Sequence, residues 1–145
     1  MRHATIVVTI VTSILAVLSP SLAASDADLS HLGEKMSGAF RCSTYAGMFQ
    51  DWKEQKRLFQ IGLKAARDFV EGVKSSNQFG ETKKFLGEVS TYFMVGMMYE
   101  TESTKADNEI RKYQDGLPRE KWLPPDEAKT QAALAYRKSD CSLIQ

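Results

Sequence analysis

The sequence predicts an all-α protein, a compact bundle of four or five helices closed by one disulfide. Apolar residues recur every three or four positions along most of the chain, which is the period of a helix that packs on one face. No stretch of strand length alternates apolar with polar residues. The chain also contains two cysteines, Cys42 and Cys141, which allow a single intramolecular pairing.

Residues 1–23 have the composition of a cleavable secretory signal peptide. A positively charged start precedes an apolar run over 4–18, and small residues at Ser21 and Ala23 form a signal-peptidase site. The same segment could instead remain as a membrane anchor, but its apolar run is shorter than the roughly 20 residues that span a bilayer. We therefore expect cleavage near Ala23, a periplasmic or secreted protein without a stable membrane anchor, and one helical domain over 24–145.

The mature chain divides into helical segments in a clear order. A short leading helix is predicted by the apolar residues of 29–40. Two long apolar stripes follow, one over 42–73 and one over 85–117, and each keeps its three-and-four spacing throughout. Prolines within 117–125 predict a linker. A last helix starts at these prolines and reaches Cys141.

The cysteine pairing constrains how these helices can be arranged. Export would place Cys42 and Cys141 in an oxidising compartment, where a disulfide is expected; two free buried thiols are the alternative. In a chain of straight antiparallel helices, the last helix would carry its cysteine away from the first one. Either the linker crosses the bundle, or a long helix breaks near Gly62, Gly96 or Thr101. We favour a break in the second long helix.

The charge balance excludes some classes of partner. Once the leader and its single charged residue, Arg2, are removed, basic and acidic residues are equal in number. Binding to nucleic acids and electrostatic binding to membranes both require clustered positive charge. We therefore expect neither, and we expect the partner to be another protein.

Residue types that carry catalysis or bind metals are sparse. His31 is the one histidine of the mature chain and has no partner motif, so neither a Ser-His-Asp triad nor a metal site is expected. We expect no enzymatic activity and no cofactor. Glu100 is the residue that could support the opposite view, an enzyme. It lies at the edge of an aromatic stretch, where burial would raise its pKa, and a carboxyl group with a raised pKa suits glycan cleavage. The alternative is an ion pair between Glu100 and a basic residue of the facing helix.

A glycine interrupts the apolar face of each long helix, at Gly62 and at Gly96. A mid-helix glycine costs about 1 kcal/mol relative to alanine, so either the two helices approach closely there or the glycines open a pocket. Methionines beside aromatic residues form either ordinary core or an adaptable binding surface. The candidate partner surface or pocket comprises Phe59, Gly62, Tyr92, Phe93, Met94, Gly96, Met98, Tyr99 and Glu100.

Four segments of the chain also resemble segments of other proteins. They are 40–46 (Phe-Arg-Cys-Ser-Thr-Tyr-Ala), 54–62, 93–100 and 140–144. Together they resemble a group of small exported proteobacterial and phage-borne proteins. Because that group carries no established activity, the resemblance implies a bacterial periplasmic location and little else.

Three functions are compatible with these features. The one we expect is a non-enzymatic interaction protein, such as an inhibitor, an immunity protein or a chaperone-like binder, that uses one helical face. The first alternative is a small-ligand carrier with a pocket between the two long helices. The second alternative is a glycan hydrolase that uses Glu100.

Overall fold

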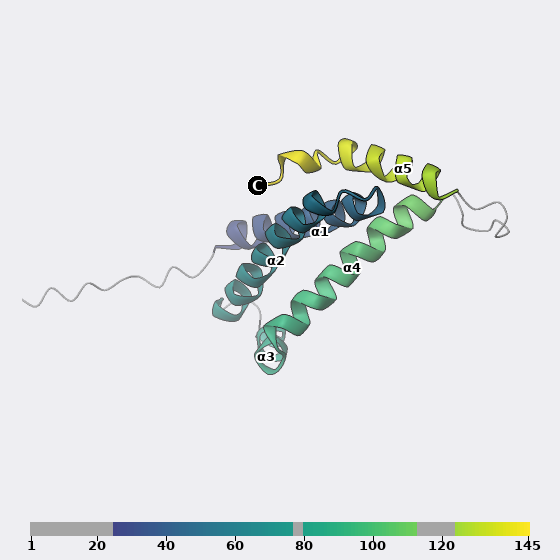
Figure 1. The fold of residues 1–145 in the computed structure, drawn as a ribbon. Coiled ribbons are helices and arrows are strands. Elements are labelled where there is room, and N and C mark those ends of the chain that lie inside the picture. The colour runs from purple at the N-terminus through teal and green to yellow at the C-terminus, as the bar shows by residue number, and fades with distance from the viewer. Residues whose placement is uncertain (1–24, 77–79, 113–123) are drawn as a thin grey trace, which may run out of the picture.

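The computed structural model describes residues 25–76, 80–112 and 124–145. Its elements are α1 (Asp26–Met48), α2 (Trp52–Ser75), α3 (Gly80–Glu88), α4 (Thr91–Arg111), α5 (Pro125–Lys138) and the short 3-10 helix η2 (Cys141–Leu143). All described elements are helices packed into one bundle, so the predicted fold class is confirmed (Figure 1). The predicted leader and most of the predicted linker lie outside the described residues. None of the described helices is both long enough and apolar enough to cross a membrane.

The first long helix of the prediction is in fact a helical hairpin. The leading helix continues through Cys42 to the end of α1, the chain turns at 49–51, and α2 begins at Trp52. Gln50 adopts a left-handed φ of 68° in this turn. The side chain of Asp51 caps α2 by accepting a hydrogen bond from the backbone N–H of Glu54 at 3.0 Å. The prediction of one helix over 42–73 was therefore wrong.

The second long helix breaks, as predicted, but at a different place. α3 ends at Glu88 and α4 starts at Thr91, whereas α4 runs without interruption through Gly96 and Thr101. Likewise α2 is continuous through Gly62. The glycines and the weak helix formers therefore did not mark the helix break. Packing against neighbouring helices overrides a propensity cost of about 1 kcal/mol.

The central helix of the bundle is α1, which contacts α2, α4, α5 and η2. Phe40 is fully buried in α1, and its ring centroid lies 6.0 Å from that of Phe59 in α2 and 5.3 Å from that of Tyr99 in α4. The rings of Phe59 and Tyr99 meet edge to face at 5.2 Å. Such pairs contribute about 0.5–1.5 kcal/mol each beyond their buried area. This three-ring cluster holds α4 against the α1–α2 hairpin.

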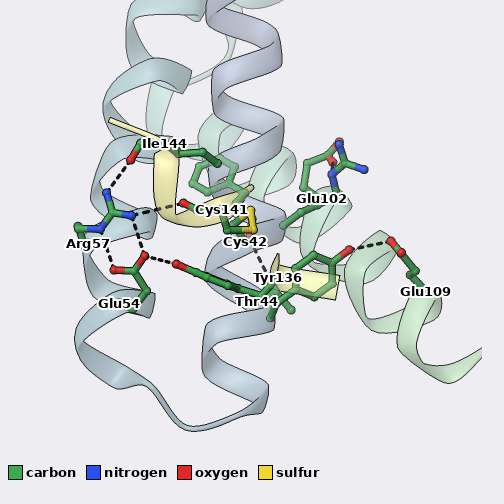
Figure 2. Close-up of a disulfide and its surroundings, with 12 residues drawn as sticks. Cys42, Thr44, Glu54, Arg57, Glu102, Glu109, Tyr136, Cys141 and Ile144 are labelled. Atoms are coloured by element: carbon green, nitrogen blue, oxygen red, sulfur yellow. Dashed lines mark hydrogen bonds and ion pairs between the residues drawn. A yellow bond between two sulfur atoms is a disulfide. The ribbon is translucent and has the colours of Figure 1, made fainter. Parts of the chain in front are cut away.

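The predicted disulfide joins Cys42 in α1 to Cys141 in η2, with the two Cα atoms 5.6 Å apart and both residues buried (Figure 2). After α5, Asp140 adopts a left-handed φ of 50° and turns the chain into η2. The hairpin turn at 49–51 places Cys42 in the second half of α1 instead of at the start of a long helix. The prediction did not include this reversal of the chain at 49–51. The reversal changes the position of Cys42 in the bundle, and therefore the point at which the last helix must end for Cys141 to reach it.

Candidate functional site

The structure divides the predicted site residues into two groups. One group faces the interior and comprises Phe59, Gly62, Met94, Met98 and Tyr99, all buried or partly buried in the core clusters or beneath them. The other group is exposed and comprises Tyr92, Phe93, Gly96 and Glu100. The nine residues therefore do not form one surface or line one pocket.

The inner group is ordinary core. Gly62 is buried beneath Phe40, and a Cβ added to Gly62 would lie 2.5 Å from Cδ1 of that ring. The expected close approach at Gly62 is thus made by an aromatic side chain of α1, and not by the backbone of the second long helix. Gly96 is exposed, and an added Cβ there meets no atom within 4 Å. The two glycines do not face each other, so the pocket predicted between them has no geometric basis.

The grooves along the described residues lie elsewhere. One of about 330 Å³ runs between α1 and α2 beside the C-terminal Gln145, and its lining includes Leu32, Ile61 and Lys64. Another of about 560 Å³ lies between α2 and α5, and its lining includes Glu54 and Tyr136. None of the predicted site residues lines either groove.

The outer group gathers on one side of α4. Tyr92 is 72% exposed, Phe93 is 60% exposed, and Met97, one turn after Phe93, is 50% exposed. At 100° per residue, Phe93, Met97 and Glu100 point away from the buried Val95 and Glu102. Gly96 lies beside them, and Tyr92 lies at the border with the buried side. We call these five residues the α4 outer face. Three of the large hydrophobic side chains exposed among the described residues, Tyr92, Phe93 and Met97, belong to it.

The apolar part of the α4 outer face is as large as the largest patches of typical monomers. An aromatic side chain offers about 150–250 Å², so the exposed fractions of Tyr92, Phe93 and Met97 together amount to on the order of 350 Å². Patches of about 300–600 Å² are often functional sites. In Figure 1, α4 runs along one edge of the bundle.

Two charged side chains lie at or beside the α4 outer face. The Cζ atom of Arg67 in α2 is 5.1 Å from the ring centroid of Tyr92, a cation–π contact. Glu100 is exposed and forms no ion pair with any described residue. Neither the burial that would favour a catalytic role for Glu100 nor its predicted ion pair with a facing helix is found in the described chain.

Polar contacts fix the start of α4 on the end of α2. Thr91 Oγ1 donates a hydrogen bond to Glu71 Oε1 at 2.7 Å, and Lys74 Nζ donates to the same hydroxyl at 2.8 Å. The hydrogen bond from Thr91 lowers the pKa of Glu71. The direction of α4 near Tyr92 is therefore set by side chains of α2.

Further along α4, contacts with α1 fix its rotation. The buried Tyr45 donates a hydrogen bond to Glu109 Oε2 at 2.7 Å (Figure 2), and burial is the main cause of its raised pKa. Glu102 is buried and lies 3.4 Å from Arg41 Nε and 2.6 Å from Lys105 Nζ. Burial acts to raise the pKa of Glu102, but the hydrogen bond from Lys105, with further hydrogen-bond and charge contributions, lowers it. These contacts turn the opposite side of α4, the outer face, toward solvent.

A second polar cluster, which the sequence analysis missed, holds the C-terminus. Arg57 donates two hydrogen bonds of 2.7 Å to the carboxylate of Glu54, and its Nη1 donates to the carbonyl of Ile144 at 2.6 Å (Figure 2). Tyr136 in α5 also donates to Glu54. The three-residue spacing of Glu54 and Arg57 was the one signal in the sequence, and nothing local indicated that Tyr136 would join them.

This cluster is a structural brace and not an acid–base pair. The hydrogen bond from Arg57 holds the pKa of Glu54 down to about 2. Burial, with the hydrogen bond to Glu54, raises the pKa of Tyr136 to about 12. General acid–base catalysis needs a group that titrates near the working pH, and neither of these two groups does so.

Two further observations bear on the class of protein. Among the described residues, no group of three or more histidine, cysteine, aspartate or glutamate side chains is arranged to hold a metal ion. No family model, no curated protein and no solved structure matches this chain.

Proposed function

We propose that this chain is a non-enzymatic interaction protein of the bacterial periplasm that binds another protein through the α4 outer face. The observation that carries the proposal is the exposure of Tyr92, Phe93 and Met97 side by side on one helix. Aromatic residues and methionine are the types enriched in protein interfaces. Aromatic anchors of this kind often dominate the binding energy.

The scaffold supports a binding role because it holds this face in a fixed position. The three-ring cluster of Phe40, Phe59 and Tyr99 packs α4 against α1 and α2, and the disulfide ties η2 to α1. A face that is ordered before binding loses little conformational freedom when the partner arrives. A rigid helical face therefore suits an inhibitor, an immunity protein or a chaperone-like binder.

The periplasmic part of the proposal is supported by two features. The composition of residues 1–23 is that of a signal peptide. The buried disulfide between Cys42 and Cys141 is of the kind that persists in oxidising compartments.

The size of the face sets the expected strength of binding. The exposed apolar surface of about 350 Å² is less than half of the roughly 800 Å² per partner in a standard interface. We therefore expect a weak or transient complex unless neighbouring surface also takes part.

Site-specific photo-crosslinking tests the proposal. A photoreactive benzoyl-phenylalanine replaces Phe93 in the mature protein, and the same residue replaces Trp52 in a matched control. Trp52 is 63% exposed, but it lies at the start of α2 and outside the α4 outer face.

The expected result is an adduct to a different protein from position 93 in a periplasmic extract. Excess unlabelled native protein should compete with this adduct, and excess Phe93→Asp protein should not. Equal adducts from positions 93 and 52, or no adduct to a second protein from either position, would contradict the proposed role of the face.

A further inference from the structure

The groove between α1 and α2 combines an apolar lining with positive charge. Its volume is about 330 Å³, and Leu32, Ile61 and Ala65 form the apolar part of its lining. This volume lies at the lower end of the range of small-molecule sites, about 300–1,000 Å³. The other described residues that line the groove are polar or charged: Lys35, Arg57, Gln60, Lys64, Asp68 and Gln145.

The side chain of Ile61 contributes apolar surface to this groove instead of to the core. Ile61 is only partly buried, and it does not pack against any of the three core clusters found among the described residues. Leu32, on the opposite wall, does pack against the cluster of Leu29 and Val73. Removing apolar surface from water is favourable, so Ile61 offers an apolar contact to a ligand that enters the groove.

Two of the three cations of the groove already have partners. Lys64 Nζ lies 2.5 Å from Asp68 Oδ2 on the same helix. The guanidinium of Arg57 donates hydrogen bonds to the carboxylate of Glu54 and to the carbonyl of Ile144 (Figure 2). The charges of these two cations are therefore compensated within the protein.

Lys35 is the remaining cation. It is partly buried, and it forms no ion pair with any described residue, the last residue Gln145 included. One uncompensated positive charge matches a ligand with a single negative charge. A phosphate ester, with a charge of about −1.5 to −2 near pH 7, fits this balance less well than a carboxylate.

We infer that this groove binds a small amphipathic carboxylate of the fatty-acid type, with its carboxylate beside Lys35 and its acyl chain against Ile61. Backbone N–H and C=O groups in the middle of α1 and α2 are bonded within their own helices. The amide groups of a bound peptide would therefore find few partners in the groove, whereas an acyl chain needs none. The inference goes beyond the proposed function and does not rest on it, because no described residue that lines the groove belongs to α4.

An NMR titration of the mature, disulfide-bonded and isotope-labelled protein with octanoate tests this inference. Backbone amide signals of the groove, from residues 32–35 and 60–65, should shift, and those of Tyr92 and Phe93 should not. Octanol has the same chain without a charge, and octylammonium has the opposite charge, so both should bind more weakly. Octanol that binds as tightly as octanoate, or shifts that do not gather at the groove, would overturn the inference.

Variants of Lys35 test the charge. Lys35→Gln should weaken octanoate binding by up to about fivefold, the scale of one exposed ion pair. Lys35→Glu should weaken it further and should bind octylammonium more tightly than the native protein does. Lys56→Glu is the matched control, because Lys56 is exposed on α2 and does not line the groove. Equal octanoate affinity in Lys35→Glu and Lys56→Glu would remove Lys35 from the site.

Chain length tests the apolar contact. Each methylene that the groove covers should strengthen binding by up to about fourfold, so octanoate should bind more tightly than hexanoate. Ile61→Ser should narrow this difference, and Leu134→Ser, which changes an exposed leucine of α5 outside the groove, should not. Far-UV circular dichroism verifies that each variant is folded.

Two outcomes would refute the apolar contact. One is equal affinity of the native protein for hexanoate and octanoate, which needs no variant. The other is a folded Ile61→Ser protein that keeps the full difference between the two acids.

Discussion

Replacing Gly62 by alanine should destabilise the protein, although alanine is the better helix former. A Cβ at Gly62 would lie 2.5 Å from Cδ1 and 2.6 Å from Cε1 of the Phe40 ring. That ring has little room to move, because it is fully buried and packs against Phe59 and Tyr99. Gly96→Ala is the matched change, since an added Cβ meets nothing there.

Two opposing contributions set the size of the effect. Alanine gains about 1 kcal/mol over glycine inside either helix, whereas overpacking a close-packed core costs about 1–3 kcal/mol. We therefore expect Gly62→Ala to lose up to about 2 kcal/mol and Gly96→Ala to gain about 1 kcal/mol. Because the helix contribution is common to both, the difference between the two variants isolates the contact with Phe40.

Urea unfolding followed by far-UV circular dichroism, at low micromolar protein, measures both variants. With a denaturant slope of about 1–3 kcal/mol per M, a difference of about 2 kcal/mol moves the midpoint by about 1 M. In a Phe40→Leu background the ring is gone, so Gly62→Ala should cost less there. If Gly62→Ala proved as stable as Gly96→Ala, the steric argument would be refuted.

Three further predictions concern the disulfide, the brace and the hydrogen bond between Tyr45 and Glu109. The double variant Cys42→Ala/Cys141→Ala should lower the free energy of unfolding by about 2–5 kcal/mol, and an unchanged urea midpoint would contradict this. Glu54→Gln should cost about 2 kcal/mol near pH 7. Because the folded-state pKa of Glu54 is lowered from 4.5 to about 2, its contribution is present above the unfolded pKa and is lost as the pH falls toward 2. Urea midpoints measured across that range should therefore converge for the variant and the native chain, and a constant difference would argue against the ion pair. Tyr45→Phe should cost about 1 kcal/mol in the same assay, since it removes the 2.7 Å hydrogen bond to Glu109; full stability would show that this bond contributes nothing.

The helix boundary at 49–51 was missed for a physical reason. A spacing of three or four identifies which side chains face the core, but it does not establish that the backbone between them is helical. α1 and α2 present their buried faces to each other, so the apolar stripe continues across the turn at 49–51. The cap at Asp51, with Glu54 three residues later, was the local signal for this boundary.

The candidate site was predicted in part for a similar reason. The segment Tyr92–Tyr99 is apolar on nearly every side, so periodicity cannot say which side is covered. Phe40 and Phe59 cover Tyr99, whereas no described residue covers Tyr92 and Phe93 to the same extent. The brace of Glu54, Arg57 and Tyr136 joins residues far apart in the chain and had no local signature.

The sequence by itself determined the helical class and the single disulfide, because helical periodicity and the presence of two cysteines can be read from the chain alone. Only the tertiary structure decided that Cys42 lies within a helix followed by a hairpin turn. It also decided that the ring of Phe40 occupies the space next to Gly62, whereas Gly96 faces solvent. Burial depends on which neighbours the fold brings to a residue. The α4 outer face therefore became visible only when the bundle was assembled.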